Sequence, residues 1–412
     1  MSSKLLIIGT VYPEPNSSAA GSRMLQLIEL FKGQGYQVTF ATAASESEYA
    51  IDLSPLGVKQ VVVRLNHSSF DEFVKELSPQ MVLFDRFMTE EQFGWRVAGN
   101  CPNALRILDT EDLHCLRHAR HQALKEKRDF TTADLLNDHA KREVASIYRC
   151  DLSLIISEYE MDLLKTVFKV DDALLHYLPF ILKPISESDQ KAWLSLEKRQ
   201  HFVTIGNFLH PPNWDALQHL KTDIWPLIRK QLPEAEMHVY GAYTQDKHRQ
   251  LHSKKEGFLI LGRAEDATEV IGKAKVLLAP LRFGAGLKGK LVESMQCGTP
   301  SITTKLGAEA MHGNLPWNGE VADSPEYFAQ AAVKHYTDKV AWESAQKNGV
   351  SIINQVYPKE KLGTDFIQRT AQLQAQLEIH RQQNFMGSML MYHTMRSTEF
   401  MSRWIEEKNK LQ

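Results

Sequence analysis

The chain has 412 residues, a length that suits two or three domains. Apolar residues make up 43% and charged residues 24%, so large buried cores are expected. The formal net charge of −2 argues against nucleic acid as a partner, because general nucleic-acid binding needs a basic surface. Four scattered cysteines lack metal-ligand spacing and indicate reduced thiols in a cytoplasmic protein. No apolar run approaches the roughly 20 residues that cross a bilayer, which leaves open a peripheral contact at the inner face of the membrane.

Strand and helix patterns alternate through the first half of the chain. The opening run "KLLIIGT" is too short for a signal peptide and reads as a core strand. Helices are expected near 21–34, 69–78, 89–99 and from about 113 to 149. The other expected strands are "QVTFATA", "QVVVRL", "MVLFDR", "ALRILDT" and "LSLIISE". This alternation predicts a parallel sheet covered on both faces.

The second half repeats the pattern after a polar, proline-containing join near 177–190. Its expected strands are "HFVTIGN", "EMHVYGA", "GFLILGR", "KVLLAPLR" and "PSITTK". A helix in between carries one apolar face, made of Leu217, Leu220, Ile224, Ile228 and Leu232.

We therefore expect two α/β domains, 1–183 and 184–370. A helical segment, 371–412, should pack back on the first domain. The sequence from about 322 onward is nearly all helical and is broken once, at Tyr357-Pro358. Its Met-rich and aromatic stretch 384–409 is more typical of a packing surface than of a site.

The stretch "KVLLAPLRFGAGLKGKLVESM" is a strand, a glycine loop and a helix that begins near Leu287. Gly284 and Gly286 let a ligand approach the backbone, and free N–H groups at the helix start favour an anion such as phosphate. Lys288 and Lys290 oppose the helix dipole unless an anion is bound. Near a diphosphate, Glu293 is placed to accept hydrogen bonds from a ribose. A glycine-rich turn with solvated lysines explains the same pattern equally well.

This stretch resembles the donor-binding segment of GT-B glycosyltransferases, in particular family 4, the glycosyl transferases group 1. In that family two glutamates are separated by seven residues, and the second contacts the donor ribose. Glu293 matches the second glutamate, whereas Ala285 replaces the first. "GAGLKGKLVES" is similar to a variant subset with a glycine loop and two basic residues, which implies that Lys288 and Lys290 meet the phosphates.

The resemblance covers nearly the whole chain and is most specific across 203–310. "VTIGNFLHPPNWDAL" is similar to the segment that opens the donor domain and includes Gly206 and Asn207, but it has Asn207, His210 and Asn213 where many relatives carry Arg or Lys. The resemblance implies that Gly241, Gly262 and Arg263 border the nucleotide base. It also implies that Gly21, Ser22 and Arg23 face the donor from the first domain.

Acidic residues and a histidine follow the strand "LRILDT". In the family a His-Asp pair occupies this strand end near the acceptor; here the pair reads Glu111-Asp112, with His114 two residues later. Asp112 and His114 are therefore candidates to position the acceptor hydroxyl or take its proton. The alternative is an acidic cluster that caps the following helix, and this alternative is favoured slightly for Glu111.

The resemblance implies a retaining transferase that moves a sugar from a nucleoside-diphosphate donor to a saccharide, lipid-linked or protein acceptor, in polysaccharide or glycan assembly. No Asp-x-Asp pair stands at a strand end, so no catalytic metal and no cofactor is expected. Lys288, Lys290 and the helix N–H groups would stabilise the departing diphosphate. Two alternatives remain: a sugar-nucleotide epimerase of the same fold, and a non-catalytic sugar-nucleotide-binding protein.

Overall fold

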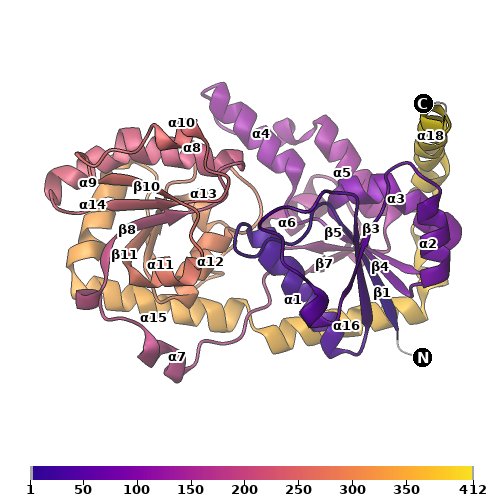
Figure 1. Ribbon diagram of the computed structural model, residues 1–412, viewed down its shortest axis with the longest axis horizontal. Helices are drawn as coiled ribbons and strands as arrows, with labels where there is room; N and C mark the ends of the chain where they lie inside the picture. The colour runs from indigo at the N-terminus through magenta and orange to yellow at the C-terminus, as the bar shows by residue number, and fades with distance from the viewer. Residues whose placement is uncertain (1–2, 411–412) are drawn as a thin grey trace.

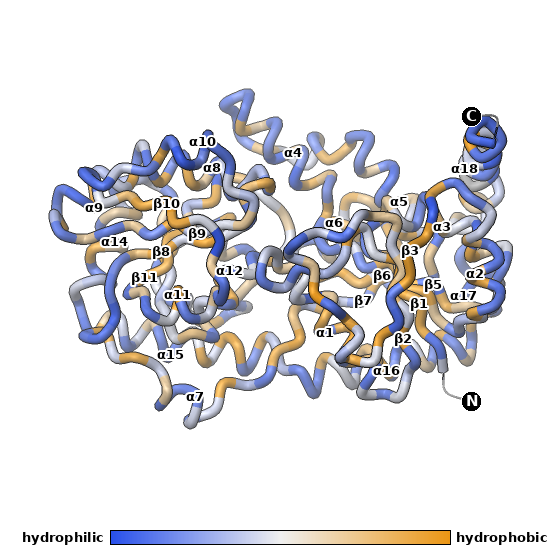
Figure 2. The backbone as a smooth tube through the Cα atoms, in the orientation of Figure 1, coloured by the Kyte–Doolittle hydropathy of each residue, from blue (hydrophilic) through white to orange (hydrophobic). Residues whose placement is uncertain are grey.

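The computed structural model describes residues 3–410, with the side chains of residues 394 and 395 left aside. It contains two parallel sheets in two α/β domains that lie side by side (Figure 1). Figure 2 shows that the strands inside each domain are mainly hydrophobic, whereas much of the outer helical surface is hydrophilic. Both sheets are thus covered by helices, as the alternation of patterns predicts.

The first sheet has seven parallel strands in the order β3-β2-β1-β4-β5-β6-β7. Its strands are β1 (Lys4–Gly9), β2 (Gln37–Thr42), β3 (Lys59–Val62), β4 (Met81–Asp85), β5 (Leu105–Asp109), β6 (Leu152–Ile155) and β7 (Leu175–Tyr177). Its helices are α1 (Ala19–Gly33), α2 (Ser69–Leu77), α3 (Arg86–Asn100), α4 (His114–Lys125), α5 (Asp138–Arg149) and α6 (Glu158–Thr166). Alternate residues of the strands point to opposite faces of the sheet. They form two cores, one beneath α1 and one beneath α2 to α6.

The second sheet has six parallel strands in the order β10-β9-β8-β11-β12-β13. Its strands are β8 (Gln200–Ile205), β9 (Met237–Tyr240), β10 (Phe258–Gly262), β11 (Ala274–Ala279), β12 (Ser301–Thr303) and β13 (Gly319–Val321). The surrounding helices are α7 (Glu187–Ala192), α8 (Pro211–His219), α9 (Trp225–Gln231), α10 (Asp246–Arg249), α11 (Ala267–Lys273), α12 (Gly289–Gln296), α13 (Lys305–Ala308), α14 (Pro325–Thr337) and α15 (Lys339–Val356).

Three local features differ from the sequence expectations. The segment 113–149 is two helices, because the chain turns between Lys125 and Asp138. A π-helical turn at Leu220–Ile224 separates α8 from α9, and Leu232, which follows the last residue of α9, is only half-buried. The edge strand β13 was not expected, since its three residues carry no hydrophobic run.

The chain crosses between the domains a second time at Tyr357 and Pro358. α16 (Lys359–Ala375) already packs on the first domain, where the ring of Phe366 meets that of Phe31 at a centroid distance of 5.6 Å. The predicted boundary at 370 is therefore misplaced, and the crossing lies about one helix earlier. Two further helices follow, α17 (Leu377–Gln383) and α18 (Phe385–Lys410).

The Met-rich segment forms α18, which packs against α3 and α5. Ser402 is buried there and accepts a hydrogen bond from Arg96 at 3.1 Å. Among the side chains that the structure describes in this helix, seven large apolar ones are exposed: Phe385, Met386, Met389, Tyr392, Phe400, Met401 and Trp404. The predicted packing surface thus exists on one face only. None of the described helices is long and apolar enough to cross a membrane.

Candidate functional site

A cavity of about 450 Å³ lies where the two domains meet. It is lined by residues that follow the carboxyl ends of β4, β5 and β6 in the first domain and of β8, β9, β10 and β11 in the second. Carboxyl ends of parallel strands are where open α/β sheets bind ligands. The cavity is therefore the candidate site. Many of the expected residues line it: Asp112, His114, Gly206, Asn207, Gly241, Arg263, Gly284, Leu287, Lys288, Lys290 and Glu293.

Two lysines stand at the start of α12 in the wall formed by the second domain. Lys288 is the residue that precedes the helix, and its Nζ donates to the carbonyl of Gly286 at 2.7 Å. Within the described residues no side chain caps this end of α12, so its first N–H groups remain without that partner. The positive end of the helix dipole and a lysine ammonium group thus border the same cavity.

Lys290 lies in the first turn of α12, and its Nζ donates to the amide oxygen of Asn213 at 2.9 Å. A Cβ atom added at Gly206 would lie 2.9 Å from the same Nζ, so a larger residue there would displace the lysine head group. Burial lowers the pKa of Lys288 and of Lys290 to about 8 in each case. Each ammonium group has a neutral hydrogen-bond partner, which leaves its charge available to a bound anion.

Glu293 follows Lys290 by three residues and also lines the cavity. Burial raises the pKa of its carboxyl group, and the charge of Lys290 opposes that effect. Among residues 3–410 no donor is hydrogen-bonded to the carboxylate, so it can accept bonds from a ligand hydroxyl. The structure thus places Glu293 in the cavity wall, and its contact with a ribose stays a prediction.

Asp112 and His114 stand on the opposite wall, in the first domain. Asp112 pairs with Arg117. Burial alone would raise the pKa of Asp112, but the charges of Arg117 and of other nearby cationic groups together hold it below its usual range. His114 Nε2 lies 3.6 Å from Asp112 Oδ1, and burial lowers the pKa of this imidazole to about 4. At neutral pH the histidine is therefore uncharged and able to accept a proton.

The acidic cluster does not cap α4, so the alternative reading of these residues is wrong. Two glutamates from other helices take that role. Glu143 accepts from the backbone N–H groups of His114 and Cys115 at 2.6 and 2.7 Å, and Glu160 accepts from that of Leu113 at 3.1 Å. Asp112 makes neither of these capping bonds, and it lines the cavity.

Glu111 also lines the cavity, although helix capping is its favoured role from sequence. Its φ of 61° lies in the left-handed region, which non-glycine residues seldom adopt. Its Oε1 is buried and has no hydrogen-bond partner among the described residues. Burial, followed by the nearby charge of Asp109, raises the pKa of Glu111. Strain and an unsatisfied polar atom at a cavity wall are features of functional sites.

Five expected residues do not line the cavity. Arg23 is fully buried, donates to Asp109 at 3.0 Å and also bonds the carbonyls of Leu178 and Pro179. Gly21 and Ser22 pack against the loop that precedes α1, so this loop reaches the cavity through residues 15–20 instead. Gly286 contacts the first domain, and Gly262 ends β10 outside the cavity. The helix start at Ala19, two residues before the expected one, accounts for the shift in the first loop.

Arg86 and Asn213 line the cavity and were not among the candidates. Arg86 directly follows β4, at the same strand edge that holds Asp112, so the strand-end rule was sufficient to find it. Asn213 required the fold, because only packing brings α8 to Lys290. One cluster of the described residues has metal-ligand geometry, and it lies outside the cavity.

Residues 199–338 match the family model for Glycosyl transferases group 1. Sucrose-phosphate synthase from Thermosynechococcus elongatus superposes with a TM-score of 0.68 at 15% identity, over 90% of this chain and 99% of that one. HepE from Anabaena, solved with UDP and glucose, gives a TM-score of 0.65 at 13% identity, over 90% of this chain and 99% of its own. The chain has the GT-B fold, and the part of it that matches the glycosyl transferases group 1 model, residues 199–338, forms most of the second domain.

A third GT-B protein, WaaG, is described as a glycosyltransferase involved in lipopolysaccharide biosynthesis. It gives a TM-score of 0.60 at 13% identity, over 87% of this chain and 98% of its own. No curated protein matches the chain in sequence. The family match lies in the second domain of the GT-B fold and contains Lys288, Lys290 and Glu293, whereas Asp112 and His114 lie outside it.

Proposed function

We propose that the protein is a retaining glycosyltransferase that moves a sugar from a nucleoside-diphosphate sugar to an acceptor hydroxyl. One observation carries the proposal: two buried lysines and the uncapped start of α12 face the cavity between the domains. A diphosphate supplies the negative charge that this arrangement lacks. The structures of HepE with UDP and of HepE with UDP-glucose make UDP-glucose the first donor to test.

In this proposal the donor lies along the second domain. The diphosphate contacts Lys288, Lys290 and the helix N–H groups, and Glu293 accepts from the ribose. The bond between the anomeric carbon and the diphosphate breaks, and its electron pair leaves with the diphosphate, which the lysines stabilise. The lysine charges stabilise the departing diphosphate, and the proposal includes neither a catalytic metal nor a cofactor.

The acceptor approaches from the first domain. Its hydroxyl oxygen attacks the anomeric carbon on the face from which the diphosphate departs, so the configuration is retained. The hydroxyl proton passes to the departing phosphate oxygen or to neutral His114, which Asp112 orients. The involvement of WaaG in lipopolysaccharide biosynthesis supports glycan assembly as the process.

The test is turnover of UDP-glucose with a panel of saccharide acceptors. Lys290→Met removes the charge and keeps a long side chain; we expect at least about a hundredfold loss of kcat/KM, as for other charged groups that stabilise a leaving anion. Lys273→Met is the matched control, since this lysine of α11 is exposed and pairs with Glu269 on its own helix. Equal activity of the Lys290 variant and the control would contradict the role of the lysine.

One observation favours a second candidate, a protein that binds sugar nucleotides without transferring them. Ala285 replaces a family glutamate, and neutral Asn207 and Asn213 stand where relatives carry cations. Calorimetric binding of UDP-glucose together with no turnover across the acceptor panel would favour this candidate. Conversion of the donor in the absence of acceptor would instead identify an epimerase.

A further inference from the structure

A second cluster of functional side chains lies at the amino end of the second sheet. His201 is in β8, His238 is in β9, and Glu236 directly precedes β9. The strands pair in parallel with Val203 opposite His238, which places Glu236 beside His201. Because Glu236 and His238 are two residues apart on an extended chain, both side chains point to the same face of the sheet. The fold thus gathers two imidazoles and a carboxylate from distant parts of the sequence.

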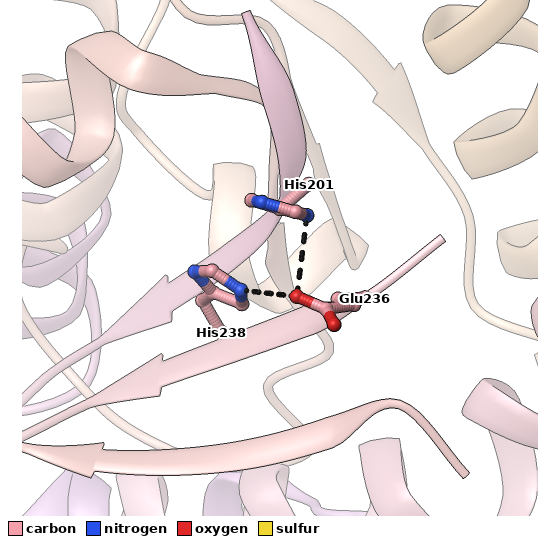
Figure 3. A group of neighbouring side chains, drawn as sticks. All are labelled: His201, Glu236 and His238. Carbon is pink, nitrogen blue, oxygen red and sulfur yellow. Dashed lines mark hydrogen bonds and ion pairs between the residues drawn. The ribbon is translucent and has the colours of Figure 1, made fainter. Parts of the chain in front are cut away.

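The three side chains converge on one point. Glu236 Oε2 lies 2.9 Å from His238 Nε2 and 3.6 Å from His201 Nδ1, and Figure 3 shows the carboxylate turned toward both rings. One ligand atom from each residue lies within 4.8 Å of the other two. With bonds of about 2.0–2.2 Å, ligand atoms around a tetrahedral zinc ion stand roughly 3.3–3.5 Å apart, so small side-chain rotations suffice to bind one.

Two observations mark this cluster as more than a surface ion pair. His201 has a φ of 60°, a left-handed conformation that is rare for a non-glycine residue within a strand. The imidazole rings are also stacked, with centroids 4.0 Å apart, an arrangement that disfavours protonation of both rings. The guanidinium group of Arg229, a cation near Glu236, donates to the carbonyl of Ala235.

The cluster is open to solvent on one side. The exposed fractions of its side chains are 32% for His201, 39% for Glu236 and 20% for His238. An ion therefore has an entry path and room for a water molecule as its fourth ligand. Two imidazole nitrogens and one carboxylate oxygen are a ligand set that suits zinc, whereas calcium and magnesium prefer oxygen ligands alone.

We propose that His201, Glu236 and His238 form a zinc-binding site. The ion binds His238 Nε2 in place of the proton that this nitrogen shares with Glu236. The neutral imidazole then carries its proton on Nδ1. By joining β8 to β9, the ion stabilises the second domain. The length of the strands separates this site from the interdomain cavity by roughly 15–20 Å. The bound ion therefore affects the stability of the domain and not sugar transfer.

The test uses the full chain without a histidine tag, freed of metal with a chelator. We expect one zinc ion to bind per chain with a Kd of about 10 µM or tighter, measured by calorimetry, and to raise the melting temperature. Cobalt, used as a probe, should produce the visible absorption bands of a tetrahedral site. Absence of a one-to-one site for zinc overturns the proposal.

Variants locate the ion. His238→Gln and His201→Asn should each weaken zinc binding at least about tenfold, and asparagine tolerates the backbone conformation at position 201. The matched control is His219→Gln, which breaks a two-ligand pair with Asp223 in the same domain and should bind zinc as the unaltered chain does. Circular dichroism verifies that the variants fold. If folded His238→Gln retains full zinc affinity, the assignment is wrong.

Discussion

Glu160 of the first domain accepts a hydrogen bond from the backbone N–H of Gly286 in the second domain, at 2.8 Å. The same carboxylate oxygen accepts from Leu113 at 3.1 Å, so it ties the glycine loop to the start of α4. A Cβ atom at Gly286 would lie 2.8 Å from that of Asp112, which shows how closely the domains approach here. Gly286, which the sequence predicts to lie against a ligand, is therefore part of the contact between the domains.

The buried position of Glu160 predicts a pH-dependent stability. Burial raises the pKa of this carboxyl group from 4.5 to about 8. Because the folded pKa exceeds the unfolded one, the contribution to stability is full below pH 4.5 and is lost as the pH rises through about 8. In Glu160→Gln the side chain keeps an oxygen acceptor but no longer titrates. Between pH 5 and 8 the unfolding free energy of this variant should therefore fall less steeply with pH than that of the unaltered chain, by up to about 1.4 kcal/mol per pH unit. Urea denaturation across this range measures it, and exposed Glu158→Gln on the same helix should leave the slope unchanged.

Glycine substitutions should separate domain closure from stability. Gly289→Ala places a Cβ atom 2.5 Å from that of Ala19, on the other side of the cleft. We expect at least about a tenfold fall in kcat/KM, since small displacements of catalytic groups are costly, with little change in melting temperature. Gly272→Ala is the control, because nothing lies within 4 Å of its added methyl group and alanine favours the helix. Full activity of Gly289→Ala would show that the closed contact is not needed.

The lysine pair predicts that nucleotide binding weakens at high pH. Lys288 and Lys290 have pKa values lowered to about 8, so the unliganded protein loses these charges as the pH rises beyond that value. The affinity for UDP should fall at least about tenfold between pH 7 and 9.5, because each lysine must regain its proton before it can meet the diphosphate. Calorimetry at both pH values tests this. In Lys290→Met the dependence should be weaker; an unchanged profile would remove Lys290 from the binding step.

Arg23 should behave as a structural residue. Asp109→Asn leaves its guanidinium group buried without a charged partner, which we expect to cost about 3–5 kcal/mol of unfolding free energy. Arg23→Met/Asp109→Leu removes both charges and should recover most of that loss. Denaturant titration gives the stabilities, and the KM for the donor in the double variant should equal that of the unaltered chain. A raised KM would return Arg23 to the binding site.

Sequence reasoning found those residues whose position follows from strand order. Asp112, Lys288 and Glu293 follow the carboxyl ends of core strands, and parallel sheets bring such ends together. It misplaced Arg23, because the partner that buries this residue is 86 positions away. It also missed the capping roles of Glu143 and Glu160, since their bonds reach helix starts that only packing determines. The local sequence pattern thus did not predict polar contacts between residues that are far apart in the chain.

The two crossings between the domains lie against each other. The backbone N–H of Leu182 donates to the carbonyl of Tyr357 at 2.9 Å, and that of Lys359 donates to the carbonyl of Leu182 at the same distance. These two bonds join both interdomain connections into one unit. A change in the relative position of the domains therefore has to displace the two connections together or break the bonds between them.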